Sequence, residues 1–306
     1  MCDNIVGEKT GRRAKMKIKA YAKINLFLDV VAKRENGFHD IESVMQTISL
    51  ADDLDINVEH ADNEPTLTVE CDSDYAPSGE DNIVYRAARK YLDAADVKAS
   101  VRIKLTKNIP SPAGLGGGSA DAAATLRALN GVFNKLDSNR LLSIADSIGS
   151  DVSFCMCGGT QIALGKGERL ESADFEMPDC FIVVACGRDK MPTPYAYRRL
   201  DEKYGDFASR AAEHTLESSK RSLGDLETMS ASLYNIFEEV TSYECPSVNQ
   251  IKDLMKENGA KGALMCGSGP AVFGIFGSEI KAKNVKRLLE GRGYFAAVGT
   301  PVKRYE

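Results

Sequence analysis

The feature that most constrains this chain is a glycine-rich segment, Gly114-Leu115-Gly116-Gly117-Gly118-Ser119. It follows a strand-like pattern at Val101–Leu105 and opens directly into an alanine-rich helical pattern at Ala120–Leu129. Glycines let a backbone approach an anion closely, and the N–H groups in the first turn of a helix point at that anion. The hydroxyl of Ser119 adds a group that can reach a phosphate oxygen or a metal ion. The segment therefore predicts a phosphate-binding loop, with a flexible turn as the alternative.

Two common nucleotide-binding loops do not fit this segment. A Walker A loop needs a lysine after its last glycine, and here Ser119 follows. The dinucleotide fingerprint follows a buried strand near the start of its domain, whereas an amphipathic strand precedes these glycines, far from the N-terminus.

Composition excludes several classes of protein. The chain has 306 residues, room for one large domain or two ordinary ones, and its 43% hydrophobic and 27% charged residues are typical of a globular protein. A net charge of −5 gives no general attraction to nucleic acid. No apolar run reaches the roughly 18–20 residues that span a bilayer. Eight scattered cysteines indicate a reducing cytoplasm rather than a disulfide scaffold.

The N-terminal nineteen residues are basic and contain no apolar stretch typical of a secretory signal. An organellar transit peptide is the weaker alternative, because Asp3 and Glu8 interrupt the charge pattern. We predict a flexible tail over residues 1–15.

Strand patterns precede helical ones and clean βαβ repeats are few, which favours an α+β fold in two lobes. A strand pattern begins at Lys17 and leads into the apolar run Leu26–Val31. The further predicted strands are Ile41–Leu50, Leu54–Val58, Leu67–Glu70, Val101–Leu105, Phe181–Ala185, Gly262–Met265, Ala271–Phe276 and Phe295–Val302. The predicted helices start at an Asp81 cap, at Ala120, at Ser138 (ending at Ile148) and at Ser247 (ending at Asn258).

Two charged side chains interrupt these patterns at positions where they could take part in a reaction. Lys23, beside Asn25, stands in a strand pattern, where its ammonium could stabilise the charge of a transferring phosphoryl group. Asp151 follows a predicted helix end and could accept a proton from an attacking hydroxyl. Each also fits a plainer interpretation, since strand lysines commonly face solvent and aspartates are common in turns.

Three further segments have both a structural and a functional interpretation. Asn36-Gly37-Phe38-His39 is either a hairpin turn or a site where Phe38 and His39 hold a flat heterocycle. Cys266-Gly267-Ser268-Gly269 is either a tight hairpin or a backbone that approaches a ligand. Cys155-Met156-Cys157 lacks the second ligand pair of a zinc site, so we interpret both thiols as core residues.

Three segments, in this order, resemble the three motifs of the GHMP kinase superfamily: Ala20–Leu28, Ile109–Leu126 and Ala263–Phe273. The resemblance extends from about Lys19 to Phe276. It implies a two-lobed α+β fold, with an N-terminal ATP-binding lobe over residues 1–165 and a C-terminal ferredoxin-like substrate lobe over 166–306. It also implies a small-molecule kinase that uses ATP with Mg²⁺, as a monomer or homodimer, without nucleic-acid or membrane partners.

Within that superfamily, further segments are similar to those of kinases whose substrate carries a diphosphocytidyl group: Asn36–Ser43, Asp81–Ile83, Gly149–Phe154 and Met191–Pro194. The resemblance implies a catalytic pair, Lys23 and Asp151, acting on a tertiary alcohol. The implied ATP-binding residues are Pro110, Ala113, Gly114, Leu115, Gly116, Gly117, Gly118, Ser119 and Asn82. The implied substrate-binding residues are Asn25, Phe38, His39, Thr193, Tyr197, Gly267, Ser268 and Gly269. Phe38 and Tyr197 would stack on cytosine, and no metal ligand is implied beyond Ser119 near Mg²⁺.

The chain departs from the family pattern at a few positions. Phe38 stands where tyrosine is usual and Tyr197 where phenylalanine is usual, so both rings remain. Ser111-Pro112, Ala120 and Ser153 also replace more common residues, and none of these changes removes a catalytic group. The alternatives are a GHMP kinase for homoserine, mevalonate or a sugar, and a non-catalytic nucleotide-binding regulator.

Overall fold

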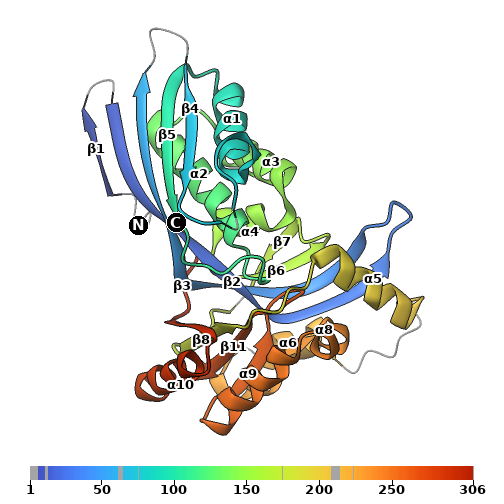
Figure 1. Cartoon of the computed structure of the whole chain (residues 1–306). Coiled ribbons are helices and arrows are strands. Elements are labelled where there is room, and N and C mark those ends of the chain that lie inside the picture. Colours follow the sequence, from blue (N-terminus) through green and yellow to red (C-terminus); the bar gives the residue numbers. More distant parts are fainter. Residues whose placement is uncertain are drawn as a thin grey trace.

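The computed structural model describes residues 6–10, 13–60, 65–74, 76–173, 175–207, 214–222 and 224–305. In this part the strands form an eight-stranded and a four-stranded sheet. Figure 1 shows them in two lobes, with the larger sheet in the upper lobe and the smaller sheet in the lower one. The arrangement agrees with the α+β prediction.

The upper lobe consists of a twisted sheet with helices against one side (Figure 1). Its main strand order is β1-β2-β3-β5-β4. The strands are β1 Val6–Thr10, β2 Arg13–Lys33, β3 His39–His60, β4 Leu67–Cys71, β5 Ala99–Thr106, β6 Thr160–Gly165 and β7 Arg169–Ser172. The helices are a short 3₁₀ turn Gly79–Asp81, α1 Ile83–Ala95, α2 Gly117–Phe133, α3 Ser138–Ile148 and α4 Ser150–Cys157.

The strands β2 and β3 connect the two lobes. They pair antiparallel along almost their whole length, from Arg13 opposite Glu59 to Lys33 opposite His39. Beyond its middle, β2 also pairs in parallel with β9, Tyr234–Asn235, which comes from the C-terminal half of the chain. The pairing of β2 with β3 and β9 therefore joins the two lobes, and the predicted site residues lie at this junction.

The lower lobe has the strand order β10-β11-β8-β12, with every neighbouring pair antiparallel. The elements β8, α9, β10, β11, α10 and β12 follow one another in the order of a ferredoxin-like unit, as the sequence predicted, with further short elements inserted between β8 and α9. Its elements are β8 Phe181–Cys186, α5 Thr193–Tyr204, α6 Leu216–Ser222, α7 Leu226–Ala231, α8 Glu238–Glu244, α9 Pro246–Glu257, β10 Gly262–Met265, β11 Val272–Phe276, α10 Glu279–Gly291 and β12 Phe295–Gly299.

Strand structure begins earlier than the sequence predicted. Instead of a tail over residues 1–15, the structure has β1 at Val6–Thr10 and starts β2 at Arg13, while residues 1–5 and 11–12 lie outside the described part. Ala14 and Met16 are buried whereas Lys15 is exposed, which is the alternation of a strand with one face in the core. The lysines and arginines of the exposed face made this segment resemble a charged tail.

One other boundary differs from the prediction. The predicted strands Ile41–Leu50 and Leu54–Val58 are one strand, β3, because the intervening Asp52 is buried rather than part of a turn. The large sheet also includes β7, which pairs with β6.

Candidate active site

A cavity of about 790 Å³ opens where the two lobes meet. Its walls come from β2, the glycine-rich segment, the start of α4, α5 and the turn between β10 and β11. All the predicted site residues line this cavity except Asn82 and Gly269. The structure thus brings together residues that are far apart in the sequence.

Asn82 lies outside the lining of the cavity. It is the N-cap of α1, in place of the predicted Asp81, and its side-chain oxygen accepts a hydrogen bond from Val84 N at 2.8 Å. Its amide nitrogen donates to the carbonyl of Pro77. The side chain is buried, and both its oxygen and its nitrogen are hydrogen-bonded within the protein.

Lys23 lies at the centre of the cavity wall. Its ammonium donates a hydrogen bond to Oδ1 of Asn25 at 3.0 Å and lies 3.4 Å from Oδ2 of Asp151. The Lys23 side chain is 7% exposed and that of Asp151 is 36% exposed. The ammonium is therefore held in place, while the carboxylate faces the open cavity.

Irregularities in β2 aim these side chains. The pairing of β2 with β3 shifts register between Tyr21 and Lys23 and again between Asn25 and Phe27. Such bulges re-aim side chains at functional sites. Asn25 is fixed further because its amide nitrogen donates to Oγ of Ser43, which leaves its oxygen for Lys23.

Asp151 belongs to the first turn of α4, whose N-cap is Gly149. The sequence predicted a turn residue after a helix end, whereas a second helix starts at once. The N-terminus of a helix carries a partial positive charge and favours a carboxylate there.

The glycine-rich segment needs its glycines. Gly114 and Gly116 have φ of 80° and 70°, in the left-handed region. A Cβ on Gly114 would lie 2.0 Å from the carbonyl oxygen of Cys266, and one on Gly116 would lie 2.9 Å from Cγ of Lys23. The segment therefore packs directly on the 266–269 turn and on the catalytic candidate. Gly116 is also the N-cap of α2, so the first N–H groups of that helix adjoin the cavity.

The far end of the cavity is aromatic. His39 is buried and stacks on Tyr197, with ring centroids 4.6 Å apart. The ring of Phe38 is 58% exposed, and the ammonium of Lys166 lies 5.4 Å from its centroid. Burial raises the pKa of the Tyr197 hydroxyl, and the charge of Asp151 adds to this effect. Because His39 covers one face of Tyr197, Phe38 has the more open ring.

Asp201, which the sequence did not single out, holds His39 in position. Its Oδ1 lies 2.7 Å from Nε2 of His39, and its Oδ2 accepts from Lys33 at 2.7 Å. Partial burial acts to raise the pKa of Asp201, but the bonds from Lys33 and His39 outweigh it and lower that pKa. A lone aspartate on a polar helix carries no sequence signal for this role.

The 266–269 turn closes the other side of the cavity. Ser268 Oγ lies 2.9 Å from Oγ1 of Thr193, which links the turn to α5. Asn235, also missed in the sequence, donates to the carbonyls of Met265 and Gly267 at 2.8 Å each. Gly269 has φ of 87° and supports the turn from outside the cavity.

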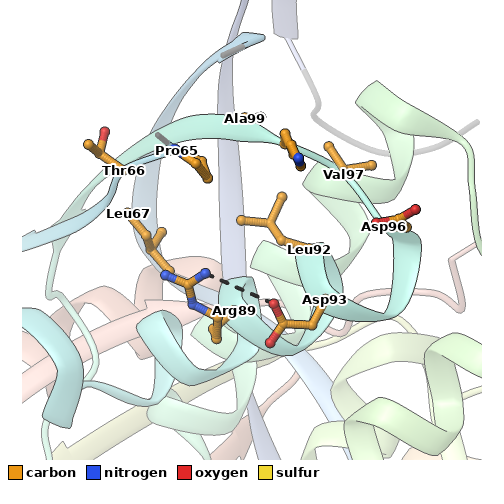
Figure 2. A pocket seen from close by; sticks show the side chains of 10 residues that line it. Pro65, Thr66, Leu67, Arg89, Leu92, Asp93, Asp96, Val97 and Ala99 are labelled. Carbon is orange, nitrogen blue, oxygen red and sulfur yellow. Dashed lines mark ion pairs between the residues drawn. The ribbon is translucent and has the colours of Figure 1, made fainter. Parts of the chain in front are cut away.

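A second cavity, of about 300 Å³, lies between the end of α1 and the start of β5. Figure 2 shows its lining, where Arg89 and Asp93 form an ion pair at 4.0 Å. It contains none of the predicted site residues.

The described residues contain no group of three or more His, Cys, Asp or Glu side chains placed to hold a metal ion. Cys155 and Cys157 are free thiols on α4, and burial raises the pKa of Cys155 to about 12. Among the described helices, none has the length and apolar character to cross a membrane.

The sequence matches two domains of one known protein family. Residues 82–159 match the GHMP kinases N terminal domain, and residues 211–294 match the GHMP kinases C terminal domain. The chain belongs to the GHMP kinases.

Individual relatives show which family within the GHMP kinases the chain belongs to. The chain is 41% identical over 278 residues to the 4-diphosphocytidyl-2-C-methyl-D-erythritol kinase of Caldicellulosiruptor bescii, covering 89% of this chain and 94% of the relative. It is also 41% identical to the kinase of that name from Listeria innocua, covering 90% and 93%. A crystal structure of 4-(cytidine 5'-diphospho)-2C-methyl-D-erythritol kinase matches with a TM-score of 0.76 at 32% identity, over 94% of this chain and 99% of that one. Within the GHMP kinases, the chain belongs to the 4-diphosphocytidyl-2-C-methyl-D-erythritol kinase family.

A homoserine kinase from Cytophaga hutchinsonii also matches, with a TM-score of 0.66 at 18% identity, over 99% of this chain and 98% of that one. At this level of identity the match shows the shared fold alone.

Proposed function

We propose that this protein transfers the γ-phosphoryl group of ATP to the 2-hydroxyl of 4-diphosphocytidyl-2-C-methyl-D-erythritol, giving the 2-phosphate and ADP. This is a step of non-mevalonate isoprenoid precursor biosynthesis, which we expect to take place in the cytoplasm. The observation that carries the proposal is the juxtaposition of Lys23 and Asp151 in one cavity with the glycine-rich segment and the Phe38–His39 turn.

The two ends of the cavity suit the two substrates. The backbone N–H groups at the start of α2 would face the phosphates of ATP, with the γ-phosphoryl group toward Lys23. Phe38 offers an exposed ring face for stacking on cytosine. Because Nε2 of His39 is paired with Asp201, the other ring nitrogen, Nδ1, is left for a hydrogen bond with the base.

Asp151 and Lys23 divide the chemistry between them. The Asp151 carboxylate would accept the proton of the 2-hydroxyl as its oxygen attacks the γ-phosphorus and the bond to the ADP oxygen breaks. The Lys23 ammonium would stabilise the charge on the transferring group and on the attacking oxygen. Since a tertiary alcohol is a poor nucleophile, most of the acceleration comes from this positioning and charge stabilisation.

Mg²⁺ would enter with the ATP phosphates, whose charge it neutralises. The described residues fit this arrangement, because Ser119 lines the cavity at the first turn of α2, where its hydroxyl could reach the ion.

The direct test is ADP release from Mg·ATP in a coupled assay. The acceptors are 4-diphosphocytidyl-2-C-methyl-D-erythritol, homoserine, mevalonate and galactose. We expect turnover with the first alone. Turnover with another alcohol would keep the kinase scaffold and contradict the cytosine pocket, and ATP binding without turnover on any of the four would favour the regulator.

A further inference from the structure

A buried ionic cluster lies behind the glycine-rich segment, outside the residues that line the active-site cavity. The Lys107 ammonium contacts a carboxylate oxygen of Asp52 and lies 2.7 Å from Oδ2 of Asp121. The side chains of Lys107, Asp52 and Asp121 are 4%, 0% and 2% exposed. Removing an ammonium and two carboxyl groups from water is costly, so a cluster this deeply buried must be held by good geometry.

The cluster connects the two ends of the glycine-rich segment. Lys107 directly follows β5, where the chain enters the segment, and Asp121 stands on α2, where the chain leaves it. Asp52 fixes the entry further, because its carboxylate accepts hydrogen bonds from the backbone N–H groups of Asn108 and Ile109, at 2.5 and 2.8 Å. One ammonium therefore bridges the start of the segment, the start of the helix and β3.

Lys107 also lies directly beneath the helix start. A Cβ added to Gly117, the first residue of α2, would lie 3.4 Å from the Lys107 nitrogen and 3.2 Å from Cγ2 of Ile109. The backbone that would face the ATP phosphates thus rests on the lysine. If the lysine is lost, nothing charged remains to hold Asp121 toward Asp52.

We propose that Lys107 is a positioning residue for nucleotide binding: clamped between Asp52 and Asp121, it holds the glycine-rich segment and the first turn of α2 in the geometry that binds the phosphates. This inference rests on the proposed kinase function. It is tested by measuring nucleotide binding, which requires no turnover.

The charges of the cluster give a second, independent readout. Two carboxylates share one ammonium, and Oδ1 of Asp121 has no hydrogen-bond partner among the described residues. Burial raises the pKa of the Asp121 carboxyl to about 8, although Lys107 acts against this. For Lys107, burial lowers the pKa but the two carboxylates outweigh it and raise it. The other titratable groups facing the cluster are Cys71 and Asp72, next to the end of β4, and the buried Cys155 on α4.

Burial favours the protonated form of the Asp121 carboxyl, so a rise in pH through its raised pKa removes that proton. Above that pKa, the carboxylate adds a negative charge behind the site for an anionic ligand. We expect nucleotide affinity to fall at least about threefold as pH rises from 7 to 9, and Asp121→Asn to remove this dependence.

The experiment compares Lys107→Met and Asp121→Asn with the parent protein by isothermal titration calorimetry. The probes are the Mg²⁺ complex of a non-hydrolysable ATP analogue and, separately, cytidine diphosphate. We expect Kd for the ATP analogue to rise at least about tenfold in Lys107→Met, with the Kd for cytidine diphosphate changed by less than about twofold. Tyr91→Phe is the matched control, because it removes a buried hydrogen bond to Asn130 in the same lobe, away from the segment.

Folding and positioning are separated by a double variant. Lys107→Met with Asp121→Leu removes one of the two buried carboxyl groups along with the ammonium, and the remaining Asp52 carboxylate keeps its hydrogen bonds from the backbone N–H groups of Asn108 and Ile109, so the double variant should fold even if Lys107→Met does not. Weak ATP-analogue binding in a folded double variant supports the proposal. Parent-like ATP-analogue affinity in either folded variant overturns it. If the parent protein phosphorylates none of the four alcohols yet the variants still lose the ATP analogue, the proposed function fails and this inference stands.

Discussion

The Lys23 ammonium nitrogen lies 3.4 Å from Oδ2 of Asp151, although the first residue stands on β2 and the second in the first turn of α4. Three features maintain this pair. The backbone N–H of Lys23 donates to the carbonyl of Leu115 at 2.9 Å, its ammonium bonds to Asn25, and Asp151 stands at a helix N-terminus. These contacts bring β2, the glycine-rich segment and α4 together at the Lys23–Asp151 pair.

The pair itself supplies the first prediction. Asp151→Asn or Lys23→Ala should lower kcat by at least about a hundredfold with little change in ATP affinity, because both groups act mainly in the transition state. Steady-state kinetics and calorimetry with the ATP analogue measure the two quantities. Lys104→Ala, which removes an exposed lysine from β5, is the control and should leave both unchanged. Near-normal turnover in both active-site variants would show that these roles are misassigned.

The contact between the glycine-rich segment and the 266–269 turn supplies the second prediction. Gly114→Ala would place a Cβ 2.0 Å from the carbonyl oxygen of Cys266, in addition to the strain of φ at 80°. Because backbone has to move, we expect a loss of about 2 kcal/mol or more in the free energy of unfolding, together with weaker ATP binding.

Gly293→Ala is the matched control for this glycine. Its φ of 84° is similar, but no atom lies within 4 Å of the added Cβ. It should therefore cost only the conformational strain, about 1 kcal/mol, and leave kcat unchanged. Equal losses of stability in both variants by urea denaturation would mean that the close approach to Cys266 is not important.

The substrate end of the cavity supplies the third prediction. Asp201→Asn removes the charged partner of Nε2 of His39, so we expect KM for the diphosphocytidyl substrate to rise about tenfold with kcat and the KM for ATP nearly unchanged. Lys33→Met is the matched variant, because it removes the other partner of Asp201 and keeps the bond to His39. If Lys33→Met raises KM as much as Asp201→Asn does, orientation of His39 is not the cause.

The same carboxylate predicts a pH effect on stability. The pKa of Asp201 in the folded protein is below its ordinary value of 3.8, so its contribution is present above that pH and is lost as pH falls through the lower, folded value. The difference in unfolding free energy between the parent and Asp201→Asn should thus be constant near neutrality and shrink below about pH 4. A difference that persists unchanged in acid would exclude the ionic contribution.

Much of the site was predictable because its residues form local patterns. The glycines at 114–118, the helix Ser138–Ile148 and the strand Gly262–Met265 depend on neighbours in the sequence, and the structure has α3 and β10 with those bounds. The elements that the sequence misjudged depend on distant partners. Asp52 interrupts an apolar pattern, and its distant partners, Lys107 and the backbone N–H of Ile109, explain why the strand continues through it.

The same reason applies to Asp201 and Asn235. Their roles depend on His39 and on the carbonyls of a turn, which are distant in the sequence and close only in the folded protein. A polar residue on a helix or short strand has no local signal for such a partner.

The last prediction concerns the C-terminal segment after β12, which returns to the upper lobe (Figure 1). The backbone N–H of Tyr305 donates to the carbonyl of Cys157 at 2.9 Å, at the C-terminal end of α4. The guanidinium of Arg127 lies 4.4 Å from the centroid of the Tyr305 ring and donates to the carbonyl of Cys155. These donors satisfy carbonyls that a helix end leaves unpaired, on the helix whose first turn holds Asp151.

Removing the Tyr305 ring should therefore affect both stability and catalysis. We expect Tyr305→Ala to lower the free energy of unfolding by about 1–2 kcal/mol, through the lost cation–π contact and packing, and to lower kcat several-fold while the Kd for the ATP analogue stays the same. Lys303→Ala is the control, because it removes only an exposed ion pair with Glu176 in the same segment. Tyr305→Phe keeps the ring and should restore both quantities. A kcat that stays at the parent level in Tyr305→Ala, despite the loss of stability, would mean that the C-terminal end of α4 can loosen without moving Asp151.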